Sequence, residues 1–384
     1  MALTEGGGLA NGLVTLFLSG DVMLGRGVDQ ILPHPGDPEL REDYVRDARG
    51  YVRLAERAHG PIPAPAGFAW PWGDALAVLG EAAPDARVIN LETSVTRSGG
   101  FAPGKAVHYR MSPGNLPAVS VALPDVCVVA NNHVLDFGRD GLAETLDALA
   151  AAGLPAAGAG HDVTEAWQPA AVPVPGGGRV LIFGCGAASS GIPPGWAATA
   201  ARPGVAFLPR LSGAAADALI ARMTAARQPG DVVVVSIHWG SNWGYDVQRD
   251  QIRFAHRLID GGADVIHGHS SHHPRPVEVY RGRLILYGCG DAINDYEGIS
   301  GHAEFRGDLR LLYLAAVAAG TGKLAALGMV PMQSRQLRLC HASAADGQWL
   351  RAVLERASRR FGSRVSQRPD GTLILRPPAG DHPH

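Results

Sequence analysis

The sequence has few cysteines, and no two of them are spaced to chelate a metal or to form a redox motif. The four are far apart, and most of them lie in apolar runs: Cys127, Cys185, Cys289 and Cys340. Free cysteine behaves as a small hydrophobic residue, so we expect buried thiols and a reducing compartment. Cysteine zinc sites and disulfide frameworks are therefore excluded as the basis of this fold.

An excess of charge of one sign is also missing. The chain has 34 Lys and Arg against 36 Asp and Glu, a formal net charge of −2. Binding to nucleic acid or to an anionic membrane usually requires a basic excess, so we expect neither partner. No apolar run approaches the ~20 residues of a membrane-spanning helix, and residues 1–11 lack the basic residues of a secretory signal. We expect a cytoplasmic protein that acts on a peptide or small-molecule substrate.

Short apolar segments alternate with amphipathic ones, and this pattern predicts an α/β fold. The expected strands are residues 14–19, 86–91, 126–130, 180–184, 232–237 and 265–267. The expected helices are residues 141–152, 214–226 and 252–260. Two hairpins are expected late in the chain, 277–280 with 284–287 and 309–318 with 323–331.

One main domain is expected to cover residues 13–340, after a flexible N-terminus of residues 1–12. Residues 341–384 are expected to form a C-terminal extension, with a helix at 344–359 and a strand at 373–375, that packs on this domain. Residues 30–65 are charged, rich in proline and poorly periodic, so they are predicted to be an insertion or lid. Residues 193–202 are predicted to be a loop.

Clusters of polar residues follow directly on several expected strands. They are Gly-Asp-Val-Met at 20–23, Asn-Leu-Glu at 90–92, Asn-Asn-His at 131–133, Ile-His-Trp-Gly at 237–240 and His-Gly-His-Ser-Ser-His-His at 267–273. Each cluster alone is explained by a turn or by a satisfied polar residue. Together they supply the carboxylates, amide oxygen and imidazoles that divalent cations accept, at strand ends that can converge. We therefore predict a metal site formed by Asp21, Glu92, Asn132, His238, His269 and His272.

The same clusters resemble the CapA family, the poly-γ-glutamate capsule proteins, within the calcineurin-like metallophosphoesterase superfamily. The resemblance is carried by residues 20–26, 90–93, 130–138, 238–240 and 267–291, and it extends over residues 13–338. It implies a four-layer α-β-β-α sandwich of the metallo-dependent phosphatase type. By superfamily analogy, one metal would be held by Asp21, Glu92 and His272, and a second by Asn132, His238 and His269, with Glu92 bridging. His133 would stand beside the metals as a proton donor or acceptor.

Two positions depart from the superfamily pattern. Met23 stands where the phosphoesterases usually have a histidine, and Glu92 stands where they have an aspartate. A thioether is a poor ligand for hard cations, so one divalent ion or two remain open. Ca²⁺, Mn²⁺ and Mg²⁺ are the favoured ions.

Acid–base groups and substrate-binding residues are also predicted near the metals. A histidine held by a carboxylate has a fixed tautomer and suits proton transfer, so the predicted catalytic residues are His133, Asp136, Asp21, His269, His272 and Asp291. Arginine suits the binding of a carboxylate or phosphate, and indole rings suit a hydrophobic pocket, with core packing as the alternative for the latter. The predicted substrate-binding residues are Arg110, Trp239, Trp243 and Arg275.

Several functions fit these residues. The preferred one, by a small margin, is Cα epimerisation of a ribosomally made peptide of the lasso type, because the resemblance includes CapA branches with that role and a bound cation would stabilise an enolate-like state. The second is a metallohydrolase of phosphoester or amide bonds, and the third is a role in poly-γ-glutamate capsule biosynthesis. The fourth is a binding module on a degenerate metal fold.

Overall fold

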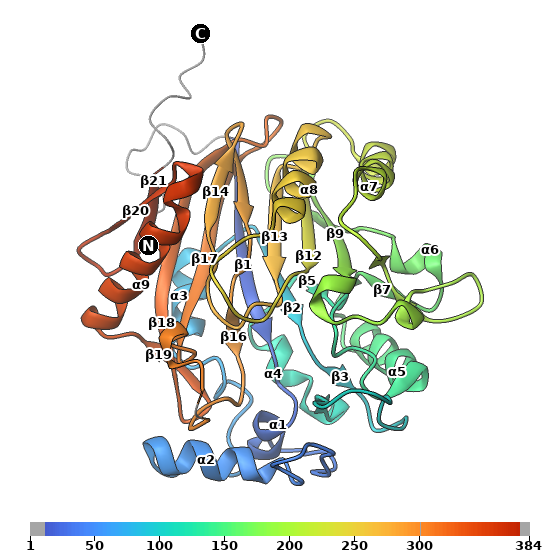
Figure 1. The fold of residues 1–384 in the computed structure, drawn as a ribbon, viewed down its shortest axis with the longest axis vertical. Helices are drawn as coiled ribbons and strands as arrows, with labels where there is room; N and C mark the ends of the chain where they lie inside the picture. The colour runs from blue at the N-terminus through green and yellow to red at the C-terminus, as the bar shows by residue number, and fades with distance from the viewer. Residues whose placement is uncertain (1–11, 300, 377–384) are drawn as a thin grey trace.

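The computed structural model describes residues 12–299 and 301–376. Within these ranges, ten strands form the larger sheet, in the order β20-β21-β18-β17-β1-β2-β5-β6, with β16 on β1 and β19 on β18 (Figure 1). Their bounds are β1 Leu13–Val22, β2 Ala86–Leu91, β5 Val126–Val128, β6 Ala156–Ala157, β16 Asp291–Ile293, β17 Leu309–Ala318, β18 Leu324–Arg335, β19 Arg338–His341, β20 Arg364–Gln367 and β21 Leu373–Arg376. Strands β1, β2, β5 and β6 run parallel, whereas β17 is antiparallel to β1.

A second sheet has seven strands in the described ranges, in the order β11-β9-β12-β13-β15-β14, with β8 on β9. Its strands are β8 Ala170–Pro173, β9 Arg179–Ala187, β11 Phe207–Leu208, β12 Val232–His238, β13 Val265–His269, β14 Val277–Tyr280 and β15 Arg283–Leu286. Two short pairs complete the β-structure, β3 Ser94–Val95 with β4 Arg110–Met111, and β7 Ala159–Gly160 with β10 Gly204–Val205. The centre of the second sheet is parallel, since β9, β12, β13 and β15 share one direction.

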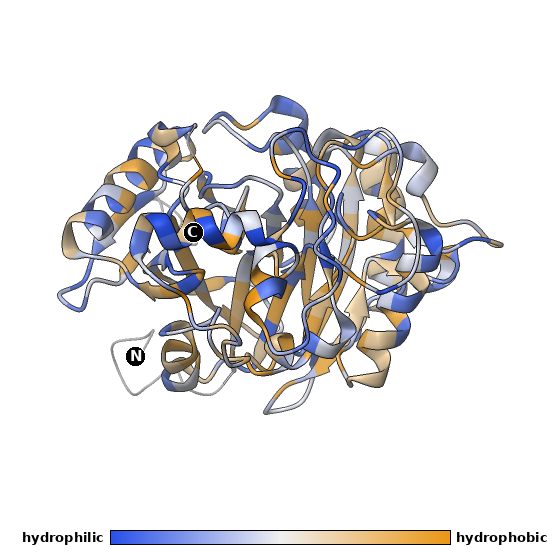
Figure 2. Cartoon of the chain, turned by 90° about the horizontal axis from the view of Figure 1, so that it is seen from below, coloured by the Kyte–Doolittle hydropathy of each residue, from blue (hydrophilic) through white to orange (hydrophobic). Residues whose placement is uncertain are grey.

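Helices surround the two sheets (Figure 1). Their bounds are α1 Gly27–Ile31, α2 Arg49–His59, α3 Ala75–Ala82, α4 Pro117–Ser120, α5 Gly138–Ala151, α6 Val163–Ala166, α7 Gly213–Ala226, α8 Arg249–Asp260 and α9 Ala344–Ser358. Alternate residues of the strands point to opposite faces, so each sheet contributes to two clusters of the core. Figure 2 shows the apolar residues concentrated on the interior strands.

Three large apolar clusters connect these layers. Leu16 and Val88 of the larger sheet share a cluster with Val234 of the second, so the sheets pack on each other. The opposite face of the larger sheet packs on α3, α4 and α5, and that of the second sheet packs on α7 and α8. The predicted α/β class is confirmed.

Each predicted strand and helix is present to within a few residues, whereas several shorter elements, such as α1, α3, β16 and β19, were not predicted. The expected strands at 232–237 and 265–267 continue to His238 and His269, so both histidines belong to strands. The predicted lid at 30–65 contains α2, which Figure 1 shows with α1 beyond the carboxyl end of β1. This helix was not predicted, because the surrounding segment is rich in charged residues and proline. Within the helix, only Tyr51 and Ala55 are buried. The loop at 193–202 contains a single 3₁₀ turn, Pro194–Trp196.

The C-terminal segment packs against the apolar cluster between the sheets and also adds strands to the larger sheet. Leu350 and Leu354 of α9 belong to the cluster between the sheets, and β21 pairs with β18, so the larger sheet continues into this segment. Strand β20 was not predicted. Residues 1–11 and 377–384, which include almost all of the predicted flexible N-terminus, lie outside the described residues. Across residues 12–299 and 301–376, no helix combines the length and apolar character needed to cross a membrane.

Candidate metal centre

Strand register places the predicted ligands beside one another. On the larger sheet, Asp21 at the end of β1 lies opposite Asn90 on β2 and Asp291 on β16. On the second sheet, His238 at the end of β12 lies opposite His269 at the end of β13. All of these strands are parallel to their partners, so their carboxyl ends meet at one edge of each sheet.

The two sheets are joined at this edge. The Ser270 amide donates a hydrogen bond to Asp21 Oδ2 at 3.2 Å, and the His267 ring donates through Nε2 to the Ser19 carbonyl at 2.7 Å. Gly20 permits the backbone of the segment at Gly290 to approach closely, because a Cβ atom at position 20 would lie 2.1 Å from the Gly290 carbonyl oxygen. The glycine before Asp21 therefore has a structural reason.

Two groups of metal-binding atoms share Asp21. One group consists of Asp21, His238 and His269, and the other consists of Asp21, His272 and Asp291; within each group the ligand atoms lie within 4.8 Å of one another. Every member of both groups is buried. Residues that are more than 200 positions apart in the chain thus form one compact centre.

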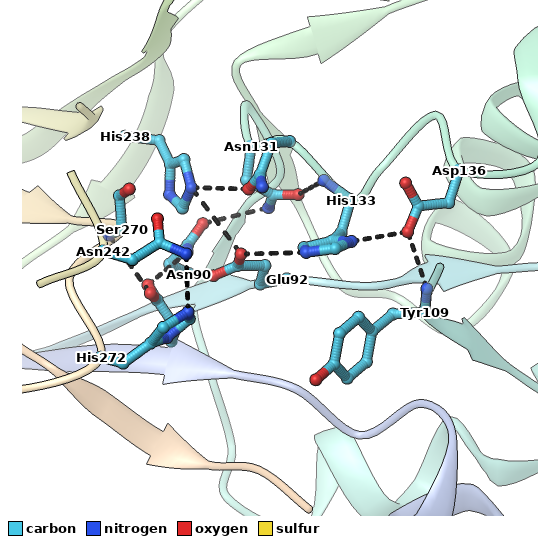
Figure 3. A network of polar contacts seen from close by, with 12 residues as sticks. Asn90, Glu92, Tyr109, Asn131, His133, Asp136, His238, Asn242, Ser270 and His272 are labelled. Carbon is cyan, nitrogen blue, oxygen red and sulfur yellow. Dashed lines mark hydrogen bonds and ion pairs between the residues drawn. The ribbon is translucent and has the colours of Figure 1, made fainter. Parts of the chain in front are cut away.

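Glu92 lies between His238 and His133 (Figure 3). Its Oε1 atom is 3.7 Å from His238 Nε2 and 3.8 Å from His133 Nε2. Its buried Oε2 atom has no hydrogen-bond partner in the described part of the chain. Asn132 joins the centre through its Oδ1 atom, 2.9 Å from His238 Nε2. The predicted ligands are therefore all brought together.

The electrostatics of this centre fit a divalent cation. Burial and the neighbouring Asp291 carboxylate raise the pKa of Asp21 to about 7. Burial and the carboxyl of Asp21 raise the pKa of Glu92 well above its usual value. Burial also lowers the pKa values of His238 and His269, which leaves neutral imidazoles with lone pairs to donate. Crowded carboxylates beside neutral imidazoles form a donor set that a cation would neutralise.

The histidine of the second group is held by a carboxylate. His272 Nδ1 lies 3.0 Å from Asp291 Oδ1, and Asn294 donates to the other oxygen of Asp291. Burial disfavours the His272 cation, but Asp291 outweighs this effect and raises the pKa of His272; the same pairing lowers the pKa of Asp291. The sequence had suggested only an acid–base role for Asp291, and the structure adds it to a ligand group.

His133 stands at the border of the centre with its ring fixed. Its Nδ1 atom lies 2.6 Å from Asp136 Oδ2, which also accepts a hydrogen bond from the Tyr109 amide at 2.7 Å. Lys105 donates to the other Asp136 oxygen and to the Asn132 carbonyl. Burial lowers the pKa of His133 to about 4, so the ring is neutral near pH 7. Through its contacts with both residues, Lys105 lies against the His133–Asp136 pair.

The predicted substrate-binding residues do not lie together in the structure. Trp243 lines a cavity of about 600 Å³ together with His272, Asn242 and Asn294. Trp239 lies in the core instead, with 1% of its surface exposed and its Nε1 donating to the Tyr287 carbonyl at 3.0 Å. Core packing, the alternative for the tryptophans, therefore describes Trp239.

Neither predicted arginine lies in this cavity. Arg275 is buried, and its guanidinium donates to the carbonyl and hydroxyl oxygens of Ser241, so it holds the loop that follows Trp239. Arg110 lies 3.7 Å above the Phe137 ring and lines a different cavity. Arg275 thus supports a loop and Arg110 packs on an aromatic ring outside the cavity beside His272; that either side chain binds an anionic group stays a prediction.

Arg26 is a residue that the sequence reasoning did not single out. It is buried, forms ion pairs with Asp295 and Glu42, and lies 4.0 Å from the Tyr51 ring. It thereby ties the predicted lid to the segment that follows Asp291. Its presence in the Gly-Asp-Val-Met-Leu-Gly-Arg motif was the available signal.

The chain is similar to a known protein family over most of its length. The family described as Bacterial capsule synthesis protein PGA_cap matches residues 15–296. The chain belongs to this family. The resemblance to CapA inferred from the motifs is confirmed.

Relatives of this family member carry related names. The chain is 54% identical over 368 residues, 96% of its length and 97% of theirs, to proteins of two strains of Mycobacterium tuberculosis named "Probable polyglutamine synthesis accessory protein". It is 30% identical over 207 residues to the PGA biosynthesis protein CapA of Bacillus subtilis, covering 54% of this chain and 52% of that protein. The capsule biosynthesis protein CapA of Bacillus anthracis is 27% identical over 290 residues, which cover 74% of this chain and 61% of that protein. These names favour the capsule alternative over peptide epimerisation, which none of them supports.

Proposed function

We propose that this protein is a metal-dependent enzyme that acts on amide bonds of a glutamate polymer during synthesis of that polymer. Two observations support the proposal: the names of the relatives refer to synthesis of a glutamine or glutamate polymer, and the ligand groups of the centre suit a metal ion that promotes hydrolysis. It includes a fold of the four-layer metallophosphoesterase type, which the succession of α3–α5, two sheets and α7–α8 supports.

The observation that carries the proposal is the sharing of Asp21 by both ligand groups. Burying several carboxyl groups together is unfavourable unless their charge is compensated. Glu92 Oε2 has no hydrogen-bond partner among the described residues, although it is buried. A cation held between Asp21, Glu92 and the imidazoles would remove both penalties.

The side chains of the centre have separable roles in this proposal. A divalent cation, when bound, supplies Lewis acidity that polarises a carbonyl oxygen and assists deprotonation of water. Asp136 holds Nδ1 of His133, so that Nε2 faces Glu92 and can accept or return a proton. Lys105 and the Tyr109 amide fix Asp136 in turn. Burial of these groups excludes bulk water from the reacting bond.

The test is an assay on a defined polymer. Purified protein with Mn²⁺ is incubated with poly-γ-glutamate, and chain length and new amino groups are measured. We expect metal-dependent cleavage or transfer, which a chelator and Asp21→Asn both abolish. Asp217→Asn is the control, because Asp217 is exposed and forms its ion pair with Arg257 on the surface. A metal-loaded protein that leaves the polymer unchanged but hydrolyses a phosphoester would refute the proposal in favour of the phosphoesterase alternative.

A further inference from the structure

A buried arginine lines the cavity beside His272. The cavity has a volume of about 600 Å³, and its lining includes Arg310 and Trp243 as well as His272. Arg310 is at the start of β17 and has 1% of its surface exposed. It is close enough to His272 and Asp291 to influence the pKa values of both. The cavity and the metal centre are therefore adjoining parts of one site.

Arg310 has no acidic partner of its own. Its Nη1 atom donates to the carbonyl oxygens of Gly307 and Leu309. Its Nε atom is buried without a hydrogen-bond partner, and Nη2 has none among residues 12–299 and 301–376. A buried guanidinium normally pairs with a carboxylate, because an uncompensated buried charge is costly. The free Nε–Nη2 edge has the geometry that receives both oxygens of one carboxylate.

The acids near Arg310 are already engaged elsewhere. Asp291 pairs with His272 and accepts from Asn294. Asp308 forms an ion pair with Arg306 at 2.8 Å and accepts from Gln333. These carboxylates attract Arg310 from a distance, but none forms an ion pair with it among the described residues. An anion brought by a ligand would supply the missing partner.

Among the residues that the structure describes, an unpartnered, buried Nε atom is found also in Arg110 and Arg275, so what distinguishes Arg310 is its other contacts and its place beside the metal centre. Arg26 has two acidic partners, Asp295 and Glu42. Arg275 has no acidic partner either, but its Nη2 atom is occupied by oxygens of Ser241 and Trp243. Arg310 alone among these arginines lines the cavity beside the metal centre.

We propose that Arg310 is a substrate-binding residue that receives the α-carboxylate of a glutamyl unit next to the reacting bond. This inference rests on the proposed function and specifies its substrate as a chain with free carboxylates. Trp243, which stacks on His302 at 4.2 Å between ring centres, would form an apolar wall for the methylene groups of the same unit. A γ-linked chain has a free α-carboxylate on every unit, so it fits this pairing of cation and apolar wall.

The experiment compares two short ligands. One is a tetramer of γ-linked glutamate, and the other is the same tetramer with every α-carboxylate converted to an amide. Binding of each to Mn²⁺-loaded protein is measured by titration calorimetry. We expect wild type to prefer the acid form, and Arg310→Gln to weaken that form roughly 10- to 100-fold, since a hydrogen-bonded charge pair is lost. Binding of the amide form should change by less than about threefold in the same variant.

Arg257→Gln is the matched control, because it removes the same charge from an exposed site and should leave both affinities unchanged. Arg310→Lys, which keeps the charge but not the two-pronged geometry, should fall between wild type and Arg310→Gln. An Arg310→Gln protein that loses affinity for both ligands equally, or for neither, overturns the assignment. Should this variant fail to fold, equal binding of the two tetramers by wild type overturns it instead. A wild type that cleaves the polymer yet does not discriminate refutes only the role of Arg310, whereas one that neither binds nor cleaves refutes the proposed function.

Discussion

The two halves of the metal centre share Asp21 but differ in how their charge is balanced. In one half, His238 Nδ1 lies 2.8 Å from His269 Nδ1, and burial lowers the pKa of both rings. In the other half, His272 and Asp291 form a pair in which the pKa of the histidine is raised and that of the acid is lowered. The first half contains neutral donors, and the second contains an ion pair.

This difference has a consequence for metal affinity. A metal ion binds the neutral form of histidine, so a ligand with a raised pKa must first release a proton. Burial favours the neutral form of His238 and His269, whereas in His272 the Asp291 carboxylate outweighs burial and favours the protonated form. We therefore infer that the half with His238 and His269 binds its cation more tightly, and that the half with His272 binds a second one weakly.

Asp21→Asn removes the residue common to both halves and should have the largest effect. We expect loss of bound metal and a fall in activity of more than about 100-fold, because even residues that only orient metal ligands contribute about 10- to 100-fold. Metal content by elemental analysis and the polymer assay measure the two outcomes. Full activity with a normal metal content would disprove the shared role of Asp21, and Asp217→Asn again provides an exposed control.

His133→Gln tests the acid–base group that belongs to neither half. General acid–base catalysis contributes about 100-fold or more, so kcat should fall by about that factor. The metal content should stay at the wild-type level, because His133 approaches the centre only through Glu92, at 3.8 Å. Asp136→Asn should lower kcat less, since it disturbs only the tautomer and orientation of the ring. A parallel loss of metal would make His133 a ligand instead.

The strand ends of the centre were predictable from the sequence because their signal is local. The run of valines before His238 and the apolar residues before His269 define parallel strands, and parallel strands end at a common edge. The convergence of Asp21, Glu92 and Asn132 on these histidines followed from the same rule. Periodicity also predicted α7 and α8, whose apolar faces cover the second sheet.

The rest of the site depends on contacts that the sequence does not encode locally. Trp239 and Trp243 are four positions apart, yet one lies in the core and the other lines the cavity, because both lie in the loop that follows β12 and this loop runs from the core to the cavity. The isolation of Arg310 is visible only when the partners of Asp291 and Asp308 are known. Helix α2 packs into two small apolar clusters and consists mostly of polar residues, so its few apolar positions do not stand out from the charged segment around it.

Replacing one histidine from each half measures the inferred asymmetry. His238→Gln should weaken binding of the first metal ion roughly 10- to 100-fold. His272→Gln should leave that first affinity within about threefold of wild type and should remove only the weaker ion. Titration calorimetry with Mn²⁺ gives both affinities. Equal effects of the two substitutions on the tight site would contradict the asymmetry.

The smallest expected effect is a pH-dependent change in thermal stability. A carboxyl group whose pKa is higher in the folded protein stabilises the fold below its unfolded pKa and loses that contribution as pH rises through its folded pKa. For Asp21 this window extends from 3.8 to about 7, so the metal-free protein should lose stability as pH rises across it. A cation replaces the lost proton, and at a concentration about 100 times its Kd it adds about 2.7 kcal/mol to stability.

Calorimetric melting at pH 5 and pH 8, with and without Mn²⁺, measures this change. We expect Mn²⁺ to raise Tm by a few °C at pH 8 and by less at pH 5, where protons compete for Asp21. Asp21→Asn should reduce the difference between the two pH values, because its amide does not titrate whereas Glu92 is still buried there, and His272→Gln should retain most of it. A stabilisation by Mn²⁺ that is as large at pH 5 as at pH 8 would mean that the cation binds without displacing a proton from Asp21, and this would contradict the role of Asp21 as the ligand common to both halves.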